Sequence, residues 1–581
     1  MEPIEYRAQR WLDLDRDEGT RKEIQDLLHA SNKDELEKRL RKRIAFGTAG
    51  LRSSMKAGFA HMNSVTVLQA SHGLAQYILN QEHACEKSDL SVVLGYDARY
   101  NSKKFARLAA AAFLEKGFRV LWFGQLVHTP MIPFAVKHYA AAAGVMVTAS
   151  HNPKNDNGYK VYWSNGCQIV PPHDAGIAAA IDAVSSIDTW DTTKVEQDPR
   201  VEHIFATAKM AYFESIRELT SGLANGQVQP FVYTPMHGVG LPFMEAVAEM
   251  LPACTKSMRV VEAQAKPDPE FPTVPFPNPE EKGALDLAKQ EAGRYKCSLV
   301  LANDPDADRF AVAEQLESGE WRQITGNQLG VMLASHVLET YKGDKAKLAM
   351  LASTVSSRML CVMAEKEGFC FNETLTGFKW LGNVAQDLQR DGYHAVYAYE
   401  EAIGYMFPSV VWDKDGIAAA AVFLKACLQW QQQGLTPWSK LQRLYKKYGY
   451  FEDANTYLIS PSPDTTNRVF TDIRRLNDGS RPENVGKRRI CRWRDLTLGY
   501  DSGTKDNRPE LPVDATAQMI TCELDDVVFT ARGSGTEPKI KLYIEAKAES
   551  SGKAKVQADE VLRDLLKEWF RPEYGLRLAG S

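Results

Sequence analysis

The chain has 581 residues, of which 44% are hydrophobic and 25% are charged, a composition that is typical of folded globular proteins and excludes a disordered chain. At about 150 residues per domain, this length predicts roughly four domains. A formal net charge of −4 provides no general attraction for nucleic acid or anionic membranes, so any anion must be bound at a local site.

The cysteines and the first residues indicate a cytoplasmic protein. The nine cysteines are scattered and include no CxxC pair, which is typical of reduced thiols. The opening segment MEPIEYRAQRWLDLDRDEGTRKE carries too many charges for a signal peptide, and no apolar run reaches the about 18 residues that a membrane span needs. We therefore expect a cytoplasmic protein that binds neither nucleic acid nor membrane.

Helices and buried strands alternate in the first part of the chain. The first forty residues carry spaced apolar positions among many charges, which indicates amphipathic helices. Apolar strands follow at 91–99, 119–124 and 144–150, and the segment 102–117 has the pattern of a helix. This alternation favours a mostly parallel, doubly wound sheet.

The same alternation recurs further along the chain. The segments 230–240, 297–309 and 394–405 each run from an apolar strand into a polar loop, and 326–341 has a helical pattern. From about Phe451 the strand-like runs VVFTAR and KIKLYIEAKA flank a Gly-Ser loop, and a final helix follows. We predict three similar doubly wound α/β domains and a smaller C-terminal α+β domain. The predicted boundaries are 1–205, 206–324, 325–450 and 451–581.

The proline-dense segment 266–283 has two interpretations. Its composition is typical of a polyproline linker. It lies inside a domain-sized segment, however, which favours a shaped loop equally.

Polar motifs follow three of the predicted strands: TASHNP at 148–153, DPDADR at 304–309 and YEEAIG at 399–404. Ser, Asn and Pro are ordinary turn formers, so the Ser-His pair alone would indicate a turn. In open α/β sheets, however, ligands bind beyond the carboxyl ends of the strands. Three polar motifs at equivalent positions therefore indicate a functional site.

Three aspartates, Asp304, Asp306 and Asp308, alternate along the second motif. Residues two apart in an extended segment share one face, so their carboxylates can converge on a hard cation, although a solvated acidic loop is the simpler alternative. An EF-hand is excluded because Arg309 and Gln315 stand where Gly and Glu are needed. A haloacid-dehalogenase-type nucleophile is disfavoured by the phenylalanine that follows. Since Mg²⁺ completes its shell with waters and phosphate oxygens, the motif predicts a phosphate ligand nearby.

The segment RGSGTEPKIK at 532–541 combines an arginine fork, the hydroxyls of Ser534 and Thr536, and two glycines. Such a loop suits the oxygens of a phosphate, although a plain surface hairpin is equally consistent with it. It is not a Walker A loop, and no GxGxxG pattern supports nucleotide binding. Further Gly-rich or charged loops are GTAGLR at 47–52, TGFKWLGN at 376–383 and DKDG at 413–416.

In this order, GTAGLR, TASHNP, DPDADR, TGFKW, YEEAIG and RGSGTEP resemble the motifs of the α-D-phosphohexomutase superfamily, over roughly residues 40 to 550. The details are most similar to its phosphoglucomutase-2 and phosphopentomutase branch. The resemblance implies four domains around a central cleft. It also implies a phosphoserine at Ser150 and Mg²⁺ held by that phosphate with Asp304, Asp306 and Asp308.

The implied activity is that of a sugar-phosphate mutase. Such an enzyme moves a phosphoryl group between the 1-position and the terminal hydroxyl, from ribose or deoxyribose 1-phosphate to 5-phosphate and from glucose 1-phosphate to 6-phosphate. The reaction passes through phosphoserine and a bisphosphate intermediate, and a sugar bisphosphate such as glucose 1,6-bisphosphate or ribose 1,5-bisphosphate is the activator. Sugar phosphates are the expected partners, and both a monomer and a dimer are compatible with the sequence.

The resemblance also assigns residues to roles. The catalytic residues implied beside Ser150 are Arg52, His151, Lys160 and Lys414, and either His151 or Lys414 is the general acid or base. The substrate-binding residues implied are Thr48, Arg309, Gly377, Phe378, Lys379, Glu400, Ala402, Arg532, Ser534, Gly535 and Thr536.

Two positions depart from the family pattern. Ala402 stands where many hexose mutases have the serine of Glu-x-Ser, and a site that lacks this hydroxyl discriminates less well for a hexose. We therefore expect a pentose phosphate or a relaxed specificity. Ala49 stands where some members have serine in GTSG and changes no assigned role.

Two alternative functions stay open. A glucose-1,6-bisphosphate synthase that takes its phosphate from 1,3-bisphosphoglycerate would share every motif. An inactive sugar-phosphate-binding paralogue is a second alternative, against which the retention of Ser150, the three aspartates and Lys414 argues.

Overall fold

The computed structural model describes residues 2–47, 50–81, 90–222, 226–251, 254, 256–534 and 538–579. The chain forms two compact units. The first comprises Met1–Leu351 and Gly377–Trp438, and the second comprises Ala352–Thr376 and Ser439–Ser581. The four predicted domain boundaries divide the chain more finely and stay a prediction. Within the described part of the chain, no helix is both long and apolar enough to span a bilayer.

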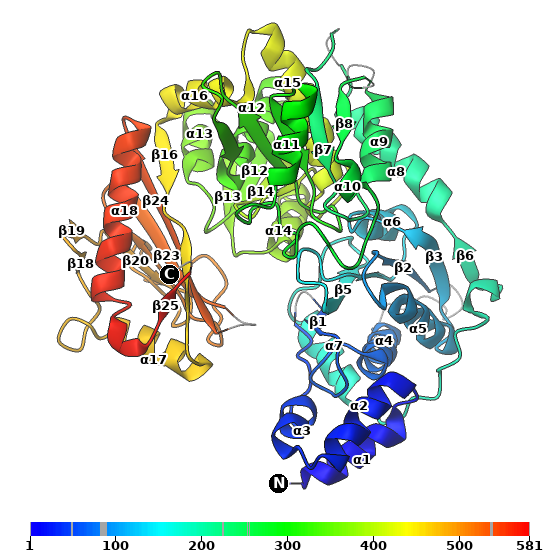
Figure 1. Cartoon of the computed structure of the whole chain (residues 1–581). Helices are drawn as coiled ribbons and strands as arrows, with labels where there is room; N and C mark the ends of the chain where they lie inside the picture. Colours follow the sequence, from blue (N-terminus) through cyan, green and yellow to red (C-terminus); the bar gives the residue numbers. More distant parts are fainter. Residues whose placement is uncertain are drawn as a thin grey trace. The chain divides into compact units, whose positions relative to one another are not determined.

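Amphipathic helices precede the first sheet, as predicted. They are drawn in blue in Figure 1 and comprise α1 (Ile4–Leu14), α2 (Glu18–His29) and α3 (Lys33–Leu40). Trp11 of α1 and Leu40 of α3 are fully buried, whereas most of the charged positions face solvent. Each of these helices therefore packs against its neighbours through one apolar face.

The first sheet has the order β1-β5-β4-β2-β3-β6. Its strands are β1 (Leu51–Ser54), β2 (Ser91–Tyr96), β3 (Arg119–Leu126), β4 (Ala143–Val147), β5 (Asp156–Trp163) and β6 (Val201–His203). The strands β4, β2, β3 and β6 are parallel, whereas β5 and β1 are antiparallel additions at one edge. The accompanying helices are α4 (Ser64–Leu79), α5 (Ser102–Glu115), α6 (Met131–His138), α7 (His173–Asp182) and α8 (Phe205–Leu219).

The second sheet has the order β11-β10-β9-β7-β8. Here β9, β7 and β8 are parallel, and β10 and β11 are antiparallel. The strands are β7 (Phe231–Thr234), β8 (Met258–Val260), β9 (Leu299–Ala302), β10 (Ala311–Gln315) and β11 (Trp321–Ile324). The helices are α9 (Leu241–Met250), α10 (Glu262–Ala265) and α11 (Asp286–Tyr295).

Both sheets are thus mixed: the predicted parallel order holds from β4 to the edge strand β6 in the first sheet and from β9 to the edge strand β8 in the second, and antiparallel pairs form the opposite edge. The reason lies in the functional motifs: residues 148–155 join β4 to β5, and residues 303–310 join β9 to β10. A parallel crossover needs about a dozen residues or more, so each of these short connections returns its strand antiparallel. The two motifs therefore form tight turns at the carboxyl ends of β4 and β9.

The third sheet has four strands, of which β14 (His394–Glu400) and β15 (Gly404–Met406) lie wholly in the first unit and pair antiparallel. The helices α12 (Gly326–Thr340), α14 (Phe378–Arg390) and α15 (Gly416–Gln432) belong to the same unit. Between α12 and α14 the chain forms β12 (Leu348–Ser353), α13 (Met359–Glu367) and β13 (Cys370–Thr374), and α16 (Pro437–Tyr448) follows α15.

The second unit contains the predicted C-terminal α+β domain, drawn in yellow to red in Figure 1. Its main sheet has the order β21-β20-β22-β23-β24-β17-β25, and β16 also pairs with β24. The predicted strands and the final helix are β23 (Val527–Gly533), β24 (Lys539–Ala548) and α18 (Ser551–Glu568). The remaining elements are β16 (Tyr450–Asp453), β17 (Thr456–Ile459), α17 (Pro463–Ile473), β18 (Asn484–Val485), β19 (Arg488–Arg489), β20 (Arg492–Asp495), β21 (Tyr500–Asp501), β22 (Met519–Glu523) and β25 (Arg577–Leu578).

The proline-dense segment 266–283 is a shaped loop and not a linker. Phe271 and Val274 are buried, and Val274 packs into the core of the second sheet. Glu270 accepts hydrogen bonds from Tyr100 at 2.5 Å and from Lys154 at 2.7 Å. The loop therefore packs against the domain that carries TASHNP.

Candidate active site

Ser150 lies in the turn after β4, where its side chain is 2% exposed. Its φ of +54° places it in the left-handed region, which is unfavourable for a residue with a Cβ. Such a conformation persists only where the surroundings hold it, and it occurs often at active sites. The turn is therefore built to present this serine.

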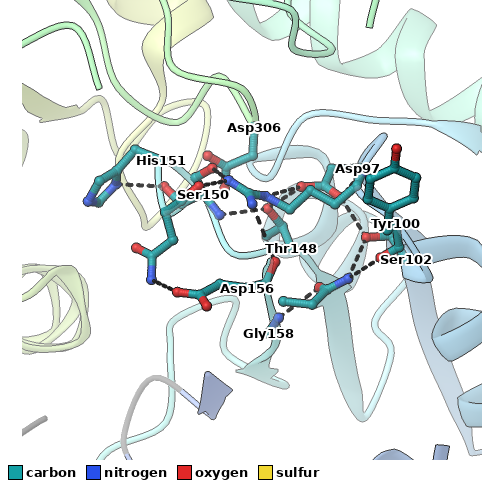
Figure 2. A network of polar contacts seen from close by, with 12 residues as sticks. Asp97, Tyr100, Ser102, Thr148, Ser150, His151, Asp156, Gly158 and Asp306 are labelled. Carbon is teal, nitrogen blue, oxygen red and sulfur yellow. Dashed lines mark hydrogen bonds and ion pairs between the residues drawn. The ribbon is translucent and has the colours of Figure 1, made fainter. Parts of the chain in front are cut away.

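A buried polar network holds the serine turn (Figure 2). The Ser150 N–H donates to Thr148 Oγ1 at 2.9 Å, and the Thr148 hydroxyl donates to Asp97 Oδ2 at 2.6 Å. Arg99 donates to the carbonyls of Ser150 and Asn152, both at 2.5 Å. Asp97 and Arg99 follow β2, which pairs with β4, so the neighbouring strand fixes the serine backbone.

The serine turn and the aspartate turn meet. The Ser150 hydroxyl donates to Asp304 Oδ2 at 2.9 Å, and it lies 3.3 Å from His151 Nδ1. These contacts join residues that are far apart in the sequence. The structure therefore brings together the two motifs that the sequence singled out.

The three aspartates form a buried cluster. Asp304, Asp306 and Asp308 are all 0% exposed, and one carboxylate oxygen of each lies within 4.8 Å of the others. Among the described residues, Asp306 Oδ1 and Asp308 Oδ1 have no hydrogen-bond partner. Burial and the charges of Asp306 and Asp308 raise the pKa of Asp304 well above its usual value. A set of convergent, partly unpaired carboxylates with excess negative charge fits a hard divalent cation.

Two lysines border the aspartate cluster. Lys160 Nζ lies 2.7 Å from Asp306 Oδ2 and 2.9 Å from Asp308 Oδ2, and Lys414 Nζ lies 2.7 Å from Asp308 Oδ2. Burial lowers the pKa of Lys414, but the carboxylates of Asp308 and Asp413 outweigh this effect and raise it overall. Lys414 is therefore a fixed positive charge.

Arg309, Arg52 and His151 add basic groups beside the cluster. The Arg309 N–H donates to Asp304 Oδ1 at 3.1 Å, and its guanidinium lies 3.9 Å from Asp304 Oδ2. Arg52 is exposed on β1 and contacts Asn152 at 3.4 Å. Burial and the charges of Arg309 and Arg52 hold the pKa of His151 well below its usual value, so its imidazole is neutral.

Glu400 ends β14, and Ala402 lies in the tight turn that leads to β15. Glu400 Oε1 accepts the N–H of Gly377 at 2.5 Å. Burial and the charge of Glu401 raise the pKa of Glu400 to about 7. This carboxyl group can therefore change its charge near neutral pH.

Phe378 and Lys379 begin α14, directly after Gly377. The Phe378 ring lies under the Lys414 ammonium at 5.7 Å, and the Lys379 ammonium lies 5.0 Å from the Trp380 ring. The TGFKW and DKDG loops are thus joined at Phe378 and Lys414.

The predicted phosphate loop belongs to the second unit. The Arg532 guanidinium donates a hydrogen bond to the Thr376 hydroxyl. The Ser534 N–H donates to the Lys539 carbonyl at 2.8 Å. The strands on either side of the loop, β23 and β24, pair antiparallel. Four positions lie outside the described residues: Thr48, Ala49, Gly535 and Thr536.

Residues outside the set predicted from the sequence also contact the aspartate cluster. Thr129 donates its hydroxyl to Asp306 Oδ2 at 2.6 Å and its N–H to the Asp306 carbonyl at 2.9 Å. Like Asp97 and Arg99, Thr129 follows a strand of the parallel part of the first sheet. The rule that located TASHNP, a polar segment beyond a strand's carboxyl end, would have found them too.

A second missed group joins α8 to the start of α15. The Tyr212 hydroxyl donates to the Asp415 carboxylate at 2.8 Å and lies 3.0 Å from His128 Nε2. Asp415 caps α15 by accepting the N–H groups of Ile417 and Ala418. Because His128 precedes Thr129 and Asp415 follows Lys414, this contact ties together two segments that touch the aspartate cluster.

Three successive segments of this chain match protein-family models. Residues 43–188, 210–317 and 325–448 match the α/β/α domains I, II and III of phosphoglucomutase/phosphomannomutase. Two solved structures share the fold. One is a phosphoglucomutase/phosphomannomutase family protein from Burkholderia thailandensis, with a TM-score of 0.64 and 16% identity, covering 92% of this chain and 99% of that one. The other is the phosphoglucomutase pp63/parafusin from Paramecium, with a TM-score of 0.65 and 18% identity, covering 91% and 95%.

Full-length relatives are considerably more similar in sequence. The phosphoribomutase of Saccharomyces cerevisiae is 45% identical, over 97% of this chain and 96% of that protein. The human phosphopentomutase is 39% identical over 98% and 96%, and the human glucose 1,6-bisphosphate synthase is 37% identical over 96% and 92%. The chain therefore belongs to the phosphoglucomutase/phosphomannomutase family of sugar-phosphate mutases, within the α-D-phosphohexomutase superfamily.

Proposed function

We propose that this chain is a phosphopentomutase that uses a phosphoserine at Ser150 and also accepts glucose phosphates. The observation that carries the proposal is the position of the Ser150 hydroxyl, 2.9 Å from Asp304 within a buried carboxylate cluster that two lysines border. The similarity to phosphoribomutase and phosphopentomutase supports the choice of sugar.

The first step transfers the phosphoryl group from Ser150 to a hydroxyl of the sugar monophosphate. The bond between phosphorus and the serine Oγ breaks, a bond from phosphorus to the sugar oxygen forms, and a proton passes from the sugar hydroxyl to the serine oxygen. In the second step the bisphosphate, after turning around, returns its other phosphoryl group to Ser150. A sugar bisphosphate therefore serves as the activator, because it phosphorylates a free serine.

The cluster of Asp304, Asp306 and Asp308 is the proposed Mg²⁺ site. Bound there with an oxygen of the serine phosphate, Mg²⁺ would neutralise charge on the phosphoryl oxygens. The chain's own cations, Lys160, Lys414 and Arg309, supply further positive charge in a buried site where it is poorly screened. Arg52 is proposed to contact the phosphoryl group from β1.

His151 is the proposed general acid and base. Its neutral imidazole can accept a proton, and its Nδ1 lies 3.3 Å from the Ser150 oxygen. Lys414 is the weaker choice because its raised pKa keeps it charged. We therefore assign proton transfer to His151 and charge stabilisation to Lys414.

Two groups are proposed to bind the sugar phosphate. Glu400 and the loop of Gly377, Phe378 and Lys379 would contact the sugar hydroxyls, and Ala402 leaves this loop without a serine hydroxyl. Arg532 and Ser534, together with Gly535 and Thr536, would bind the phosphate that is not transferred, and Thr48 is a further proposed substrate-binding residue. Because fewer polar groups require pairing, a pentose should be accepted at least as well as glucose.

The direct test is a coupled assay of Ser150→Ala with Mg²⁺ and a sugar bisphosphate, run on ribose 1-phosphate and glucose 1-phosphate in parallel. We expect turnover to be abolished, whereas Ser164→Ala, which changes an exposed serine, should behave as the wild type. Near-native isomerisation by Ser150→Ala would contradict the serine assignment. A strong preference of the wild type for glucose 1-phosphate would contradict the role of Ala402.

Glucose-1,6-bisphosphate synthesis is the second candidate, because the human enzyme of that name is 37% identical. It is tested by supplying 1,3-bisphosphoglycerate with glucose 1-phosphate, and bisphosphate formation faster than mutase turnover would favour it. An inactive paralogue would show neither activity and no phosphopeptide across Ser150. We place the enzyme in the cytoplasm, where its sugar phosphates would occur.

A further inference from the structure

A separate cavity of about 630 Å³ lies in the first unit. Its walls come from the end of α8, α12, the end of α14, the first residues of β14, the segment 407–412 and α15. Neither the serine turn nor the aspartate cluster contributes to the lining. The volume lies within the range of about 300–1,000 Å³ that is typical of small-molecule sites.

Several aromatic rings form part of the walls of this cavity. Tyr341, Tyr393, His394 and Trp412 line it and are each at least partly exposed, and Phe407 forms a buried surface. Tyr341 and His394 are fixed by a 2.8 Å contact between the Tyr341 hydroxyl and His394 Nδ1. Rings held in this way form a preorganised surface for another flat ring.

The charge of the cavity favours an anion. Lys425 of α15 contributes its side chain to the lining, and the described lining residues include no Asp or Glu. Lys425 is 7% exposed, and its ammonium donates to the Ser221 carbonyl at 2.8 Å. An ammonium has three donors, so it can also bind an acceptor in the cavity. Burial lowers the pKa of Lys425, and an anionic ligand would offset that cost.

The cavity shares two elements with the candidate active site. His394 begins β14 at the cavity and Glu400 ends it at the site, so the two regions are about 20 Å apart along a strand of this length. Trp412 lines the cavity two residues before Lys414. The backbone of Trp412 packs closely on α14, because a Cβ at Gly382 would lie 2.3 Å from the Trp412 carbonyl oxygen.

We propose that this cavity binds a small planar aromatic molecule that carries a carboxylate, sulfonate or phosphate group, and that the segment from Phe407 to Lys414 couples its occupancy to turnover. A ring stacked on Trp412 would restrict this segment and thereby the position of the Lys414 ammonium. Coupling between two sites is reciprocal in binding free energy, so the sugar phosphate should in turn change the affinity of the cavity.

The test uses two dyes on the full chain, with Mg²⁺ and saturating glucose 1,6-bisphosphate present so that the active site is occupied. The probe 8-anilinonaphthalene-1-sulfonate is an aromatic anion whose fluorescence rises on binding, and N-phenyl-1-naphthylamine is its uncharged analogue. We expect one saturable site for the anion. A parallel titration without the bisphosphate is the control: dye binding that is found there but is absent at saturating bisphosphate would show competition for one site and overturn the proposal.

Two variants locate the dye. Ser409→Trp places a large side chain in the lining and should weaken binding of both dyes at least tenfold, whereas Ser318→Trp, an exposed control on another turn, should have no effect. Lys425→Met should weaken binding of the anionic dye about tenfold and leave binding of the uncharged dye unchanged. Equal dye binding by wild type, Ser409→Trp and Lys425→Met, with melting curves that show all three folded, would overturn the assignment.

Turnover measures the coupling. We expect saturating anionic dye to change kcat or KM for ribose 1-phosphate at least twofold in the wild type and to leave both unchanged in Ser409→Trp. Unchanged kinetics in the wild type at full dye occupancy would overturn the coupling. An inactive wild type would contradict the proposed function instead, and the dye titrations would still decide whether the cavity binds an aromatic anion.

Discussion

Ser150 shows how much of the site depends on single residues. A serine at a positive φ stores backbone strain, and the hydrogen bonds from the Ser150 N–H to Thr148 and from Arg99 to the Ser150 carbonyl offset it. The same contacts aim the hydroxyl at Asp304. The contacts that stabilise the Ser150 backbone therefore also position its hydroxyl.

Thr148→Val should show how much the positioning of Ser150 contributes to turnover while the serine itself is retained. Valine keeps the shape of threonine but removes the oxygen that accepts the Ser150 N–H and donates to Asp97. Positioning contacts of this kind are worth about 10- to 100-fold, so kcat should fall by that factor with little change in KM. Steady-state kinetics check this, with Thr207→Val, which changes a hydroxyl at the surface contact with Tyr139, as control. An unchanged kcat would show that the network does not position Ser150.

Glu400 should impose a pH dependence on catalysis. Burial raises its pKa to about 7, so the carboxyl is protonated below that pH and ionised above it. If the ionised form accepts hydrogen bonds from the sugar, kcat/KM rises with pH up to about 7 and then levels. Glu400→Gln should lower kcat/KM and remove this limb. A difference profile between the two enzymes cancels the titration of the substrate phosphate, and identical profiles would contradict the role.

At the scale of elements, the short connections between antiparallel strands matter most. Residues 148–155, 303–310 and 401–403 each turn one strand back beside its neighbour and carry a functional motif at the turn. Since these turns are short, they leave little freedom to the side chains that they present. A long crossover loop would not hold Ser150 and Asp304 within hydrogen-bonding distance as firmly.

Tyr212→Phe tests the link between α8 and α15. It removes the hydroxyl that donates to Asp415 and contacts His128, both buried. We expect a loss of about 1–3 kcal/mol in unfolding free energy, because Asp415 loses a donor, and a several-fold lower kcat through Lys414. Tyr139→Phe is a matched control, since its hydroxyl contacts Thr207 at the surface. Denaturant unfolding and steady-state kinetics measure both effects. Equal unfolding free energies and equal kcat values for the two variants would refute the link.

Glu545 on β24 should make the second unit sensitive to pH. Burial raises its pKa from 4.5 to about 7, although the N–H of Arg358 donates to it at 2.8 Å. The folded state then binds the proton more tightly than the unfolded state, so this stabilisation is complete below pH 4.5 and is lost as pH rises through about 7. The loss amounts to at most about 3 kcal/mol. Glu545→Gln should remove this dependence. Denaturant unfolding at pH 5 and pH 8 checks it: an equal change in the free energy of unfolding between the two pH values in the wild type and the variant would contradict the role of Glu545.

For the molecule as a whole, the charges of the site matter more than the net charge. The formal net charge is only −4, yet Asp304, Asp306 and Asp308 are gathered in one buried place. Buried like charges destabilise the folded state unless cations compensate them. Lys160 and Lys414 compensate part of this charge.

Removal of divalent metal should therefore affect both activity and stability. We expect a chelator to abolish turnover and Mg²⁺ to restore it. Mg²⁺ should also raise the melting temperature of the wild type, because a ligand that binds only the folded state stabilises it. Asp308→Asn should lose most of this increase in a thermal shift measurement, whereas Asp506→Asn, at an exposed loop, should keep it. An equal increase in both variants would place the metal elsewhere.

The sequence by itself determined the order of the elements, the mixed α/β character and the chemistry of TASHNP and DPDADR. These properties follow from short-range patterns, since apolar periodicity specifies strands and helices and adjacent polar residues specify a turn. The resemblance to a family rested on the same short motifs. The antiparallel edges were also implicit there, because the loops after β4 and β9 are too short for a crossover.

Only the tertiary structure decided which distant residues serve the site. Arg99 reaches the Ser150 carbonyl, Thr129 reaches Asp306 and Tyr212 reaches Asp415, in each case from another part of the chain. No periodicity encodes such pairs, because they depend on how strands are ordered in a sheet and how helices pack on it. The same holds for the pKa of Glu400 and for the aromatic cavity beside Trp412, since burial is a property of the packed molecule.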